Sequence, residues 1–316
     1  MMTLKLLLLL LFLPVFFSLP LAAATLEKKQ KKIHDFETTY LQSTAGTGVG
    51  SLLMDESAIL NPASISFFNL SSVYLQRTTT DFKDDKSTDQ GHVNRPAEDS
   101  RTYAAIAADS KSTVKGAFSY QKQREWQNER KRFSLSVASP FGKFSSLGML
   151  TRRTTDITTD DGRNTTKDSY TQFTIGALHA TQYGLTIGAI AIDPLGKKIA
   201  DRRVIVGGQY LIANVLSLMA DVGSDYQENL SDNILYRGAF QINVFSDLYL
   251  RAGLFRDKGL MEKGSGAGIS WVSPKLMVAV ALKNTTFLYD QNLERSTSIY
   301  YPKAMKEVAL SVSLRF

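Results

Sequence analysis

Few side chains in this sequence have the type and spacing that catalysis or metal binding requires. The chain contains no cysteine, so disulfides, thiolate metal sites and cysteine nucleophiles are excluded. The three histidines, His34, His92 and His179, are far apart along the chain. Asp160 and Asp161 lie in a polar stretch that lacks the alternate-residue spacing of a calcium loop. We therefore predict no metal site and no other cofactor.

Catalysis by a serine would need a histidine beside it and a polar group that orients the imidazole. His179 lies in the segment 169–180, which alternates like a strand, and the sequence places no serine beside it. No glycine-rich phosphate loop of the Walker type is present either. We predict that the protein has no enzymatic activity.

Charged residues recur at the polar phase of several alternating segments. The set comprises Lys115, Arg203, Arg237, Arg251 and Arg315, opposed by Asp221 and Glu307. If these side chains faced an open channel, the basic excess would favour anions, because a low-dielectric wall focuses the electric field. In the alternative, they pair internally and anchor a segment inside the protein. Whether the charged residues face a channel or pair internally depends on the secondary-structure elements that carry them.

Segments in which apolar and polar residues alternate, as in β-strands, make up most of the chain. In 233–244 an apolar face alternates with a polar one, and the final segment repeats this pattern up to Phe316. Fourteen strands are predicted, at 71–79, 102–109, 113–121, 132–138, 143–152, 169–180, 184–193, 203–211, 214–222, 233–244, 247–256, 264–272, 275–283 and 305–316. The mean hydropathy of −0.13 excludes a bundle of membrane helices, but it is compatible with strands that have one apolar face.

The links between these strands alternate between long and short. The long ones are predicted at 80–101, 122–131, 153–168, 194–202, 223–232, 257–263 and 284–304. An even strand number with all long links at one end is typical of outer-membrane barrels, whereas a periplasmic β-sandwich, the alternative, has no reason for it. The terminal Phe316 looks like the C-terminal insertion signal of bacterial outer-membrane proteins, which the barrel-assembly machinery reads.

Residues 1–24 are typical of a cleaved export signal. Lys5 precedes an apolar run, and a run of alanines ending at Ala24 offers the small residues that a signal peptidase requires. The alternative is a retained membrane anchor, against which the helix breakers Pro14 and Pro20 argue. We predict cleavage after Ala24, which removes Lys5 and takes the formal charge from +7 to +6. Because the chain is predicted to be exported and its basic residues are scattered, we expect these residues to contact anionic lipid headgroups and not nucleic acid.

The segment 25–70 does not alternate, and it ends in a recognisable turn. Pro62 restricts Asn61 to an extended conformation, and the Asn61 side chain can bond to the backbone two residues on, at Ala63. An ordinary turn into the first strand and a functional hatch turn are both compatible with these residues. A stretch of small residues from Ala45 and the acidic pair at 55–56 precede the turn.

This order of small residues, acidic pair and Asn-Pro-Ala directly before a strand resembles the N-terminal hatch of the FadL family. Those proteins are outer-membrane transporters for long-chain fatty acids and other hydrophobic compounds, and PorV-like proteins share the pattern. The resemblance implies a fourteen-stranded barrel whose hatch plugs the lumen from the periplasmic side. In this chain the predicted loops are shorter and more polar than is typical of the family, and their best hydrophobic candidates are Phe287, Leu288, Tyr289 and Leu293.

The sequence thus predicts an all-β, transmembrane antiparallel barrel in the bacterial outer membrane, with a signal peptide (1–24), a hatch (25–70) and a barrel (71–316). The first functional hypothesis is passive uptake of hydrophobic or amphipathic small molecules. In it, Asn61, Pro62 and Ala63 form the hatch turn, and Phe287, Leu288 and Tyr289 capture the ligand. The alternatives are a general or anion-preferring porin that uses Arg237 and Arg251, and a non-transporting scaffold or secretion accessory. The expected partners are outer-membrane lipids, lipopolysaccharide and the assembly machinery.

Overall fold

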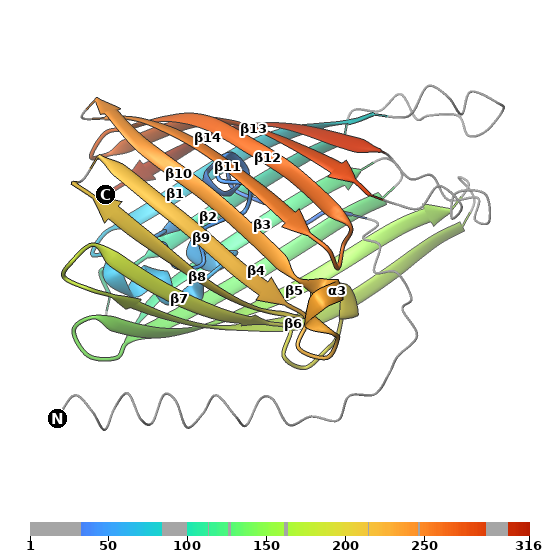
Figure 1. Ribbon diagram of the computed structural model, residues 1–316. Helices are drawn as coiled ribbons and strands as arrows, with labels where there is room; N and C mark the ends of the chain where they lie inside the picture. Colours follow the sequence, from blue (N-terminus) through green and yellow to red (C-terminus); the bar gives the residue numbers. More distant parts are fainter. Residues whose placement is uncertain are drawn as a thin grey trace.

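The structure, a computed structural model, describes residues 33–83, 100–112, 114–125, 128–160, 164–213, 215–245, 247–288 and 303–316. In these residues fourteen strands form one closed barrel (Figure 1). They are β1 (Ser71–Lys83), β2 (Ser100–Asp109), β3 (Lys115–Glu125), β4 (Asn128–Pro140), β5 (Ser145–Asp160), β6 (Asn164–Ala180), β7 (Leu185–Ile192), β8 (Arg203–Ile212), β9 (Leu216–Ser224), β10 (Leu235–Phe245), β11 (Leu248–Asp257), β12 (Glu262–Val272), β13 (Leu276–Phe287) and β14 (Ala304–Arg315). Short helices are α2 (Thr39–Ser43), η2 (Asp55–Ala58), η3 (Pro62–Phe67), η5 (Ile199–Asp201) and α3 (Leu230–Asn233). Within the described ranges, no helix is long and apolar enough to cross a membrane.

Each strand pairs with its neighbours in the sequence, and the first pairs with the last. β1 runs antiparallel to β14 from Ser72 opposite Arg315 to Lys83 opposite Ala304, which closes the sheet. A closed sheet has no strand edge with unpaired backbone groups, so its wall can lie in lipid. The predicted fourteen-stranded antiparallel barrel is therefore confirmed.

Long links lie at one end of the barrel only. This loop end carries the links 84–99, 193–202, 225–234 and 288–303. At the opposite turn end, where Phe316 also lies, no link is longer than the five residues 110–114.

Two of the links predicted to be long are mostly strand. The segment 122–131 lies in the β3–β4 hairpin, and 153–168 lies in the β5–β6 hairpin. Their threonines and charged residues continue the backbone ladder, which needs no apolar side chain. The hydrophobic alternation therefore stops before the strands do, and the strict alternation of long and short links was wrong at these places.

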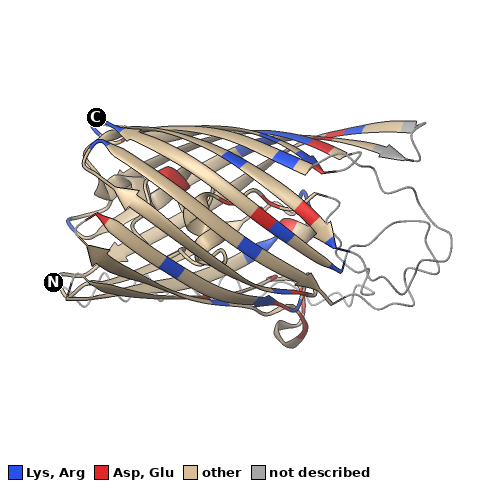
Figure 2. Ribbon diagram, turned by 90° about the horizontal axis from the view of Figure 1, so that it is seen from above, with Lys and Arg blue, Asp and Glu red and all other residues tan. Residues whose placement is uncertain are grey.

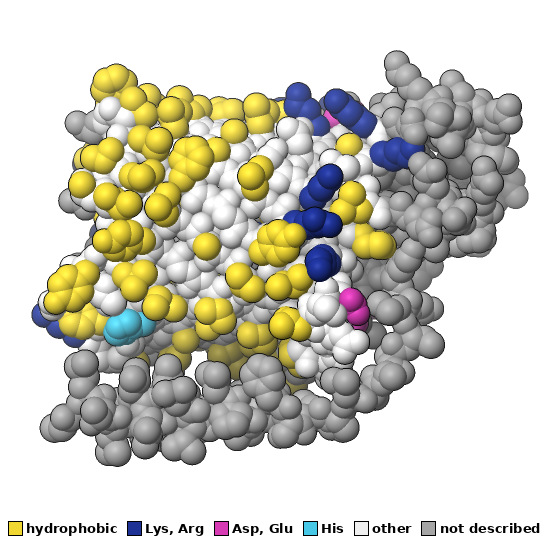
Figure 3. All heavy atoms as spheres, viewed as in Figure 1, with side chains coloured by type: hydrophobic (Ala, Val, Ile, Leu, Met, Phe, Trp, Pro, Cys, Tyr) yellow, Lys and Arg dark blue, Asp and Glu magenta, His cyan; other side chains and the backbone are white. Residues whose placement is uncertain are grey.

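The two faces of the wall differ in polarity, because successive side chains of a strand point to opposite sides. In β1, Tyr74 and Gln76 are buried inside the barrel, whereas Leu75 between them is 55% exposed on the outer face. In β14, Ser311 is buried and Leu310 is exposed. Figure 3 shows hydrophobic side chains gathered on the outer face toward the turn end. An apolar outside around a polar interior is the arrangement that suits a barrel in a bilayer.

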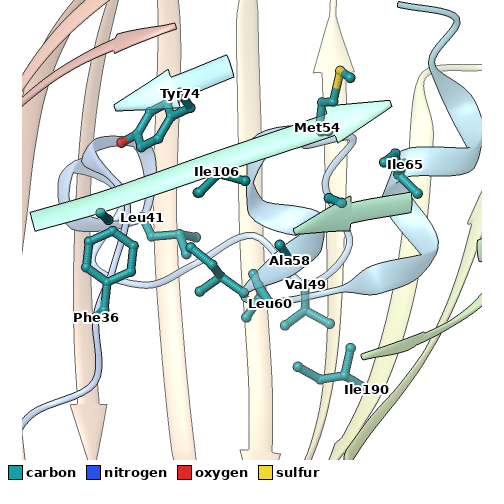
Figure 4. Close-up of a cluster of buried hydrophobic side chains, with 14 of the residues drawn as sticks. Phe36, Leu41, Val49, Met54, Ala58, Leu60, Ile65, Tyr74, Ile106 and Ile190 are labelled. Atoms are coloured by element: carbon teal, nitrogen blue, oxygen red, sulfur yellow. The ribbon is translucent and has the colours of Figure 1, made fainter. Parts of the chain in front are cut away.

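Residues 33–70 lie inside the barrel and are called here the luminal segment (Figures 1 and 4). Thr38 caps α2, because its hydroxyl accepts a hydrogen bond from the Leu41 N–H (3.3 Å). Asn61 caps η3 in the same way, with its Oδ1 accepting from the Ala63 N–H (3.1 Å), so the predicted side-chain bond of this turn is present. Apolar side chains of the segment form one buried cluster with inward-facing residues of the wall such as Ile106 (Figure 4).

Candidate functional site in the barrel lumen

Three pairs of opposed glycines on the inner wall lie directly against the luminal segment. The pairs are Gly148 with Gly176 (β5–β6), Gly188 with Gly207 (β7–β8) and Gly253 with Gly266 (β11–β12). A Cβ atom at any of the six would come within 3.0 Å of another atom. Only glycine permits another segment of the chain to approach a strand so closely. Sequence reasoning missed these pairs, although each glycine lies on the inward phase of its strand.

The first pair receives the predicted hatch turn, residues 61–63. A Cβ on Gly148 would lie 2.6 Å from the Ala63 nitrogen, and one on Gly176 would collide with the Asn61 side chain. The Asn61 amide also donates to the Val49 carbonyl oxygen at 2.8 Å. The turn is therefore fixed both to the wall and to the preceding part of the luminal segment.

The glycine-rich stretch of the luminal segment is held by two of the predicted charged residues. Asp221 of β9 accepts hydrogen bonds from the N–H groups of Gly48 (2.9 Å) and Val49 (3.3 Å). Arg237, directly opposite Asp221 on β10, donates to the Gly46 carbonyl oxygen at 2.7 Å. An acceptor and a donor on adjacent strands thus bind the backbone of one loop.

The other predicted charged residues also make contacts inside the barrel. Lys115 donates to the carbonyl oxygens of Ser66 (3.0 Å) and Phe68 (2.7 Å) in the luminal segment. The Arg251 guanidinium lies 4.6 Å from the centre of the Tyr40 ring. Arg203 pairs with Asp257, Arg315 lies 3.7 Å from the Met277 sulfur, and Glu307 lines the cavity described below. These contacts favour internal pairing and anchoring over an open path for anions.

The acidic pair of the luminal segment binds hydroxyl groups. Asp55 accepts from Ser72 of β1 (2.6 Å) and Ser313 of β14 (3.2 Å), the two strands that close the barrel. Glu56 accepts from the Thr38 hydroxyl at 2.6 Å. Burial, with the adjacent Asp55 charge as a second cause, raises the pKa of Glu56 to about 7. The pair therefore links the segment to the barrel closure and has a protonation state that changes near neutral pH.

A cavity of about 140 Å³ lies between the luminal segment and the wall, with Phe255, Leu260 and Glu262 from the loop end of the barrel among its lining. Six basic side chains, His34 among them, and six acidic side chains line it, together with apolar ones such as Phe36 and Ile205. Figure 2 shows that charged residues on the strands gather toward the same end. Because both signs are present in equal number, the cavity has no basic surplus that would select anions.

Ion pairs hold the part of the luminal segment that borders this cavity. Glu37 pairs with Lys283 at 2.7 Å, and Asp35 pairs with Arg132 at 3.4 Å. His34 Nδ1 lies 3.0 Å from a Glu125 oxygen. Burial lowers the pKa of His34, but the charge of Glu125, the hydrogen bond to it and the charges of Glu262 and Glu307 together outweigh burial and bring the pKa to about 9. Residues 34–37 are thus held by ion pairs and by hydrogen bonds from wall side chains such as Gln123 and Gln76, whereas wall glycines lie against residues 42–50 and 61–63.

Of the three predicted capture residues, the structure places two. Phe287 is the last residue of β13 and not part of a loop, and it is only 6% exposed. Its ring lies 5.1 Å from the His34 ring, and it forms a small cluster with Phe82 and Met305. Leu288 follows and is 39% exposed, while Tyr289 lies outside the described residues. The role of these residues in capture stays a prediction.

The structure does place a serine beside His179. Ser145 Oγ lies 2.8 Å from His179 Nδ1 on the exposed outer face near the turn end, a contact that the sequence alone could not reveal. In the described part of the chain, no carboxylate pairs with the imidazole to orient it, as a catalytic triad would require. Among these residues there is also no group of three or more possible metal ligands.

The barrel has solved structural neighbours, although no protein-family model and no curated protein sequence matches the chain. The CymD monoaromatic hydrocarbon channel superposes with a TM-score of 0.60 at 10% identity, over 88% of this chain and 96% of that one. The Ralstonia pickettii toluene transporter TbuX gives 0.60 at 10% identity, over 92% and 99%. A Pseudomonas aeruginosa FadL homologue gives 0.52 at 13% identity, over 88% and 97%. The chain therefore has the same fold as these channels and transporters, including the FadL homologue.

Proposed function

We propose that the protein is an outer-membrane barrel for the passive uptake of small hydrophobic or amphipathic molecules, and that the luminal segment is its hatch. One observation carries the proposal: wall glycines lie against the luminal segment at residues 42–50 and 61–63, whereas ion pairs and hydrogen bonds from wall side chains hold residues 34–37, beside the cavity. The shared fold with a hydrocarbon channel and a toluene transporter supports it.

In this proposal a solute enters from the loop end. It first meets the aromatic cluster of Phe82 and Phe287, which lies against His34. Displacing residues 34–37 from their ion pairs enlarges the cavity without moving the docked turn at 61–63. The mixed apolar and charged lining favours a solute with an apolar body and a polar group over a pure hydrocarbon.

The proposed setting is the outer membrane with the loop end outward. Short turns at one end and longer links at the other support this orientation. Export by residues 1–24 with cleavage after Ala24, and assembly through Phe316, complete the proposal; the signal lies outside the described residues. A porin is not favoured, because Arg237 and Arg251, which it would use, contact the luminal segment.

The proposal can be tested in vesicles and planar bilayers with the full mature chain. We expect faster uptake of an amphipathic aromatic probe than protein-free vesicles show, no accelerated uptake of a sugar of similar mass, and no steady ionic current. Deleting residues 25–63 should produce a steady current, because the barrel would lose its hatch. A current through the intact protein, or silence after the deletion, would contradict the hatch.

A further inference from the structure

The outer face of the wall changes from apolar to basic as the strands approach the loop end. In β2 the exposed Tyr103 is followed in this direction by Arg101, and in β3 the exposed Phe118 is followed by Lys122 and Arg124. Figure 3 shows the same change on another side of the barrel, with basic side chains toward the loop end. There Leu254 of β11 is followed by the exposed Arg256.

Basic residues at this level lie directly opposite one another on neighbouring strands. These rim pairs are Arg101 with Arg124 (β2–β3), Lys122 with Lys131 (β3–β4) and Arg256 with Lys263 (β11–β12). Like charges in directly opposed positions destabilise an antiparallel pair. Opposed cations such as Arg256 and Lys263 therefore indicate an anionic partner that offsets the repulsion.

Few carboxylates balance the charges of two of these pairs, Lys122 with Lys131 and Arg256 with Lys263. Glu129 lies 3.7 Å from the Lys122 ammonium and 3.0 Å from that of Lys131, so one carboxylate serves two cations. In the part of the chain that the structure describes, Arg256 and Lys263 have no ion-pair partner within 4.0 Å. Both side chains are exposed on the outer face, where a lipid headgroup can reach them.

The turn end does not repeat this arrangement. Its exposed lysines, such as Lys143 and Lys275, lie in turns and not in opposed strand pairs, and the acidic Asp109 and Asp247 are exposed at the same end. The two rims thus differ in charge, as expected if the two leaflets around the barrel carry different headgroups.

We infer that the rim pairs bind the phosphate groups of a phosphorylated glycolipid of the lipopolysaccharide type in the outer leaflet. The pairs lie where the apolar outer band ends, which is the level of lipid headgroups. A phosphate bears up to two negative charges and several acceptor oxygens, which matches two opposed cations. The inference rests on the proposed outer-membrane setting with the loop end outward.

The test compares retention of a diphosphorylated glycolipid by the full mature chain in neutral detergent, measured by native mass spectrometry. Each lost cation weakens headgroup binding by about 1 kcal/mol, so Arg256→Gln with Lys263→Gln should retain the glycolipid about 30-fold more weakly. The matched control, Lys143→Gln with Lys275→Gln, changes two exposed lysines of the turn end and should retain it like the parent. Equal retention by both double variants, or unchanged retention of the glycolipid after phosphatase treatment, would overturn the inference.

Two further measurements separate this inference from the proposed function. Heat-modifiable gel migration checks that the variant barrel is folded; if it is not, Arg101→Gln with Arg124→Gln makes the same comparison on another side of the wall. Uptake of the aromatic probe in neutral-lipid vesicles should not change in either double variant, because the rim pairs do not face the lumen. Glycolipid retention without probe uptake would contradict only the proposed function, and uptake without phosphate-dependent retention only the inference.

Discussion

Gly148 of β5 and Gly176 of β6 lie directly opposite each other, and the turn at residues 61–63 rests against both. Two further glycine pairs receive the segment around Val49 and around Thr44. At Gly148, Gly188, Gly253 and Gly266 the nearest atoms are backbone atoms of the luminal segment, which cannot rotate away as a side chain can, so these parts of the segment are rigidly docked. In the proposed function, the movement that admits a solute is in residues 34–37, which ion pairs and hydrogen bonds from wall side chains hold.

A side chain at Gly148 should displace the turn and open the lumen. Its Cβ would lie 2.6 Å from the Ala63 nitrogen, and such overpacking costs about 1–3 kcal/mol. We expect Gly148→Val to raise the single-channel conductance in planar bilayers. Gly238→Val is the matched control, because a Cβ there meets nothing within 4 Å. Equal conductance of the two variants would contradict the docking role of the glycine pair.

Docking of the luminal segment should weaken as pH rises through neutrality. Burial raises the pKa of Glu56 from 4.5 to about 7, so the folded chain favours the neutral acid. The stabilisation is complete below about pH 4.5 and is lost as pH rises through 7. We expect amides of residues 38–60 to exchange hydrogen faster at pH 8 than at pH 5, after correction for the intrinsic rate.

Glu56→Gln should largely remove this pH dependence, because the amide stays neutral. Asp55→Asn is the companion variant, since burial raises the pKa of Asp55 as well and its charge acts on Glu56. Arg251 and Tyr40 lie in the same surroundings, and Arg251 opposes the shift of Glu56. Protection that is the same at pH 5 and pH 8 in the parent protein would rule out a titrating Glu56.

The ion pair between Lys283 and Glu37 should control release of the proposed moving part. The two side chains are 10% and 17% exposed, so removing one leaves a largely buried charge without its partner. A double-mutant cycle with Lys283→Met and Glu37→Gln should give a coupling of about 0.5–3 kcal/mol, measured by proteolysis within residues 33–41. The exposed pair Lys198–Asp168 is the control, with about 0–1 kcal/mol expected. A larger coupling in the control pair would contradict this role.

The barrel could be predicted from the sequence because its wall separates lipid from a polar interior, which imposes period two on every strand. Register could not be predicted, because it depends on where each link lies. The predicted link 153–168 is centred about one and a half residues before the observed one, 161–163, and this error shifts the β5–β6 pairing by three residues. The contact of Ser145 with His179 and the Gly148–Gly176 pair were both hidden by that shift.

The sequence could predict which charged side chains face the lumen, but not which residues they contact there. The phase of each strand places Arg237 and Asp221 inside, but only the fold shows that both bind the loop at residues 46–49. Phe287 was predicted in a loop because the threonines before it break the apolar pattern. The pairing of β13 with β12 up to Glu262 nevertheless extends the strand to Phe287.

Phe287 should be the first aromatic contact of a solute in the proposed uptake path. Its ring lies 5.1 Å from His34 at the loop end, and an aromatic pair contributes about 0.5–1.5 kcal/mol beyond its buried area. Phe287→Ala should therefore lower the uptake of an aromatic probe several-fold at low concentration, and Phe287→Leu should restore part of it through its apolar volume. Leu288→Ala is the neighbouring control, because that side chain is 39% exposed and is not part of the cluster. If Leu288→Ala reduced uptake and Phe287→Ala did not, the solute would reach the cavity by a path that avoids the cluster of Phe82, Phe287 and Met305.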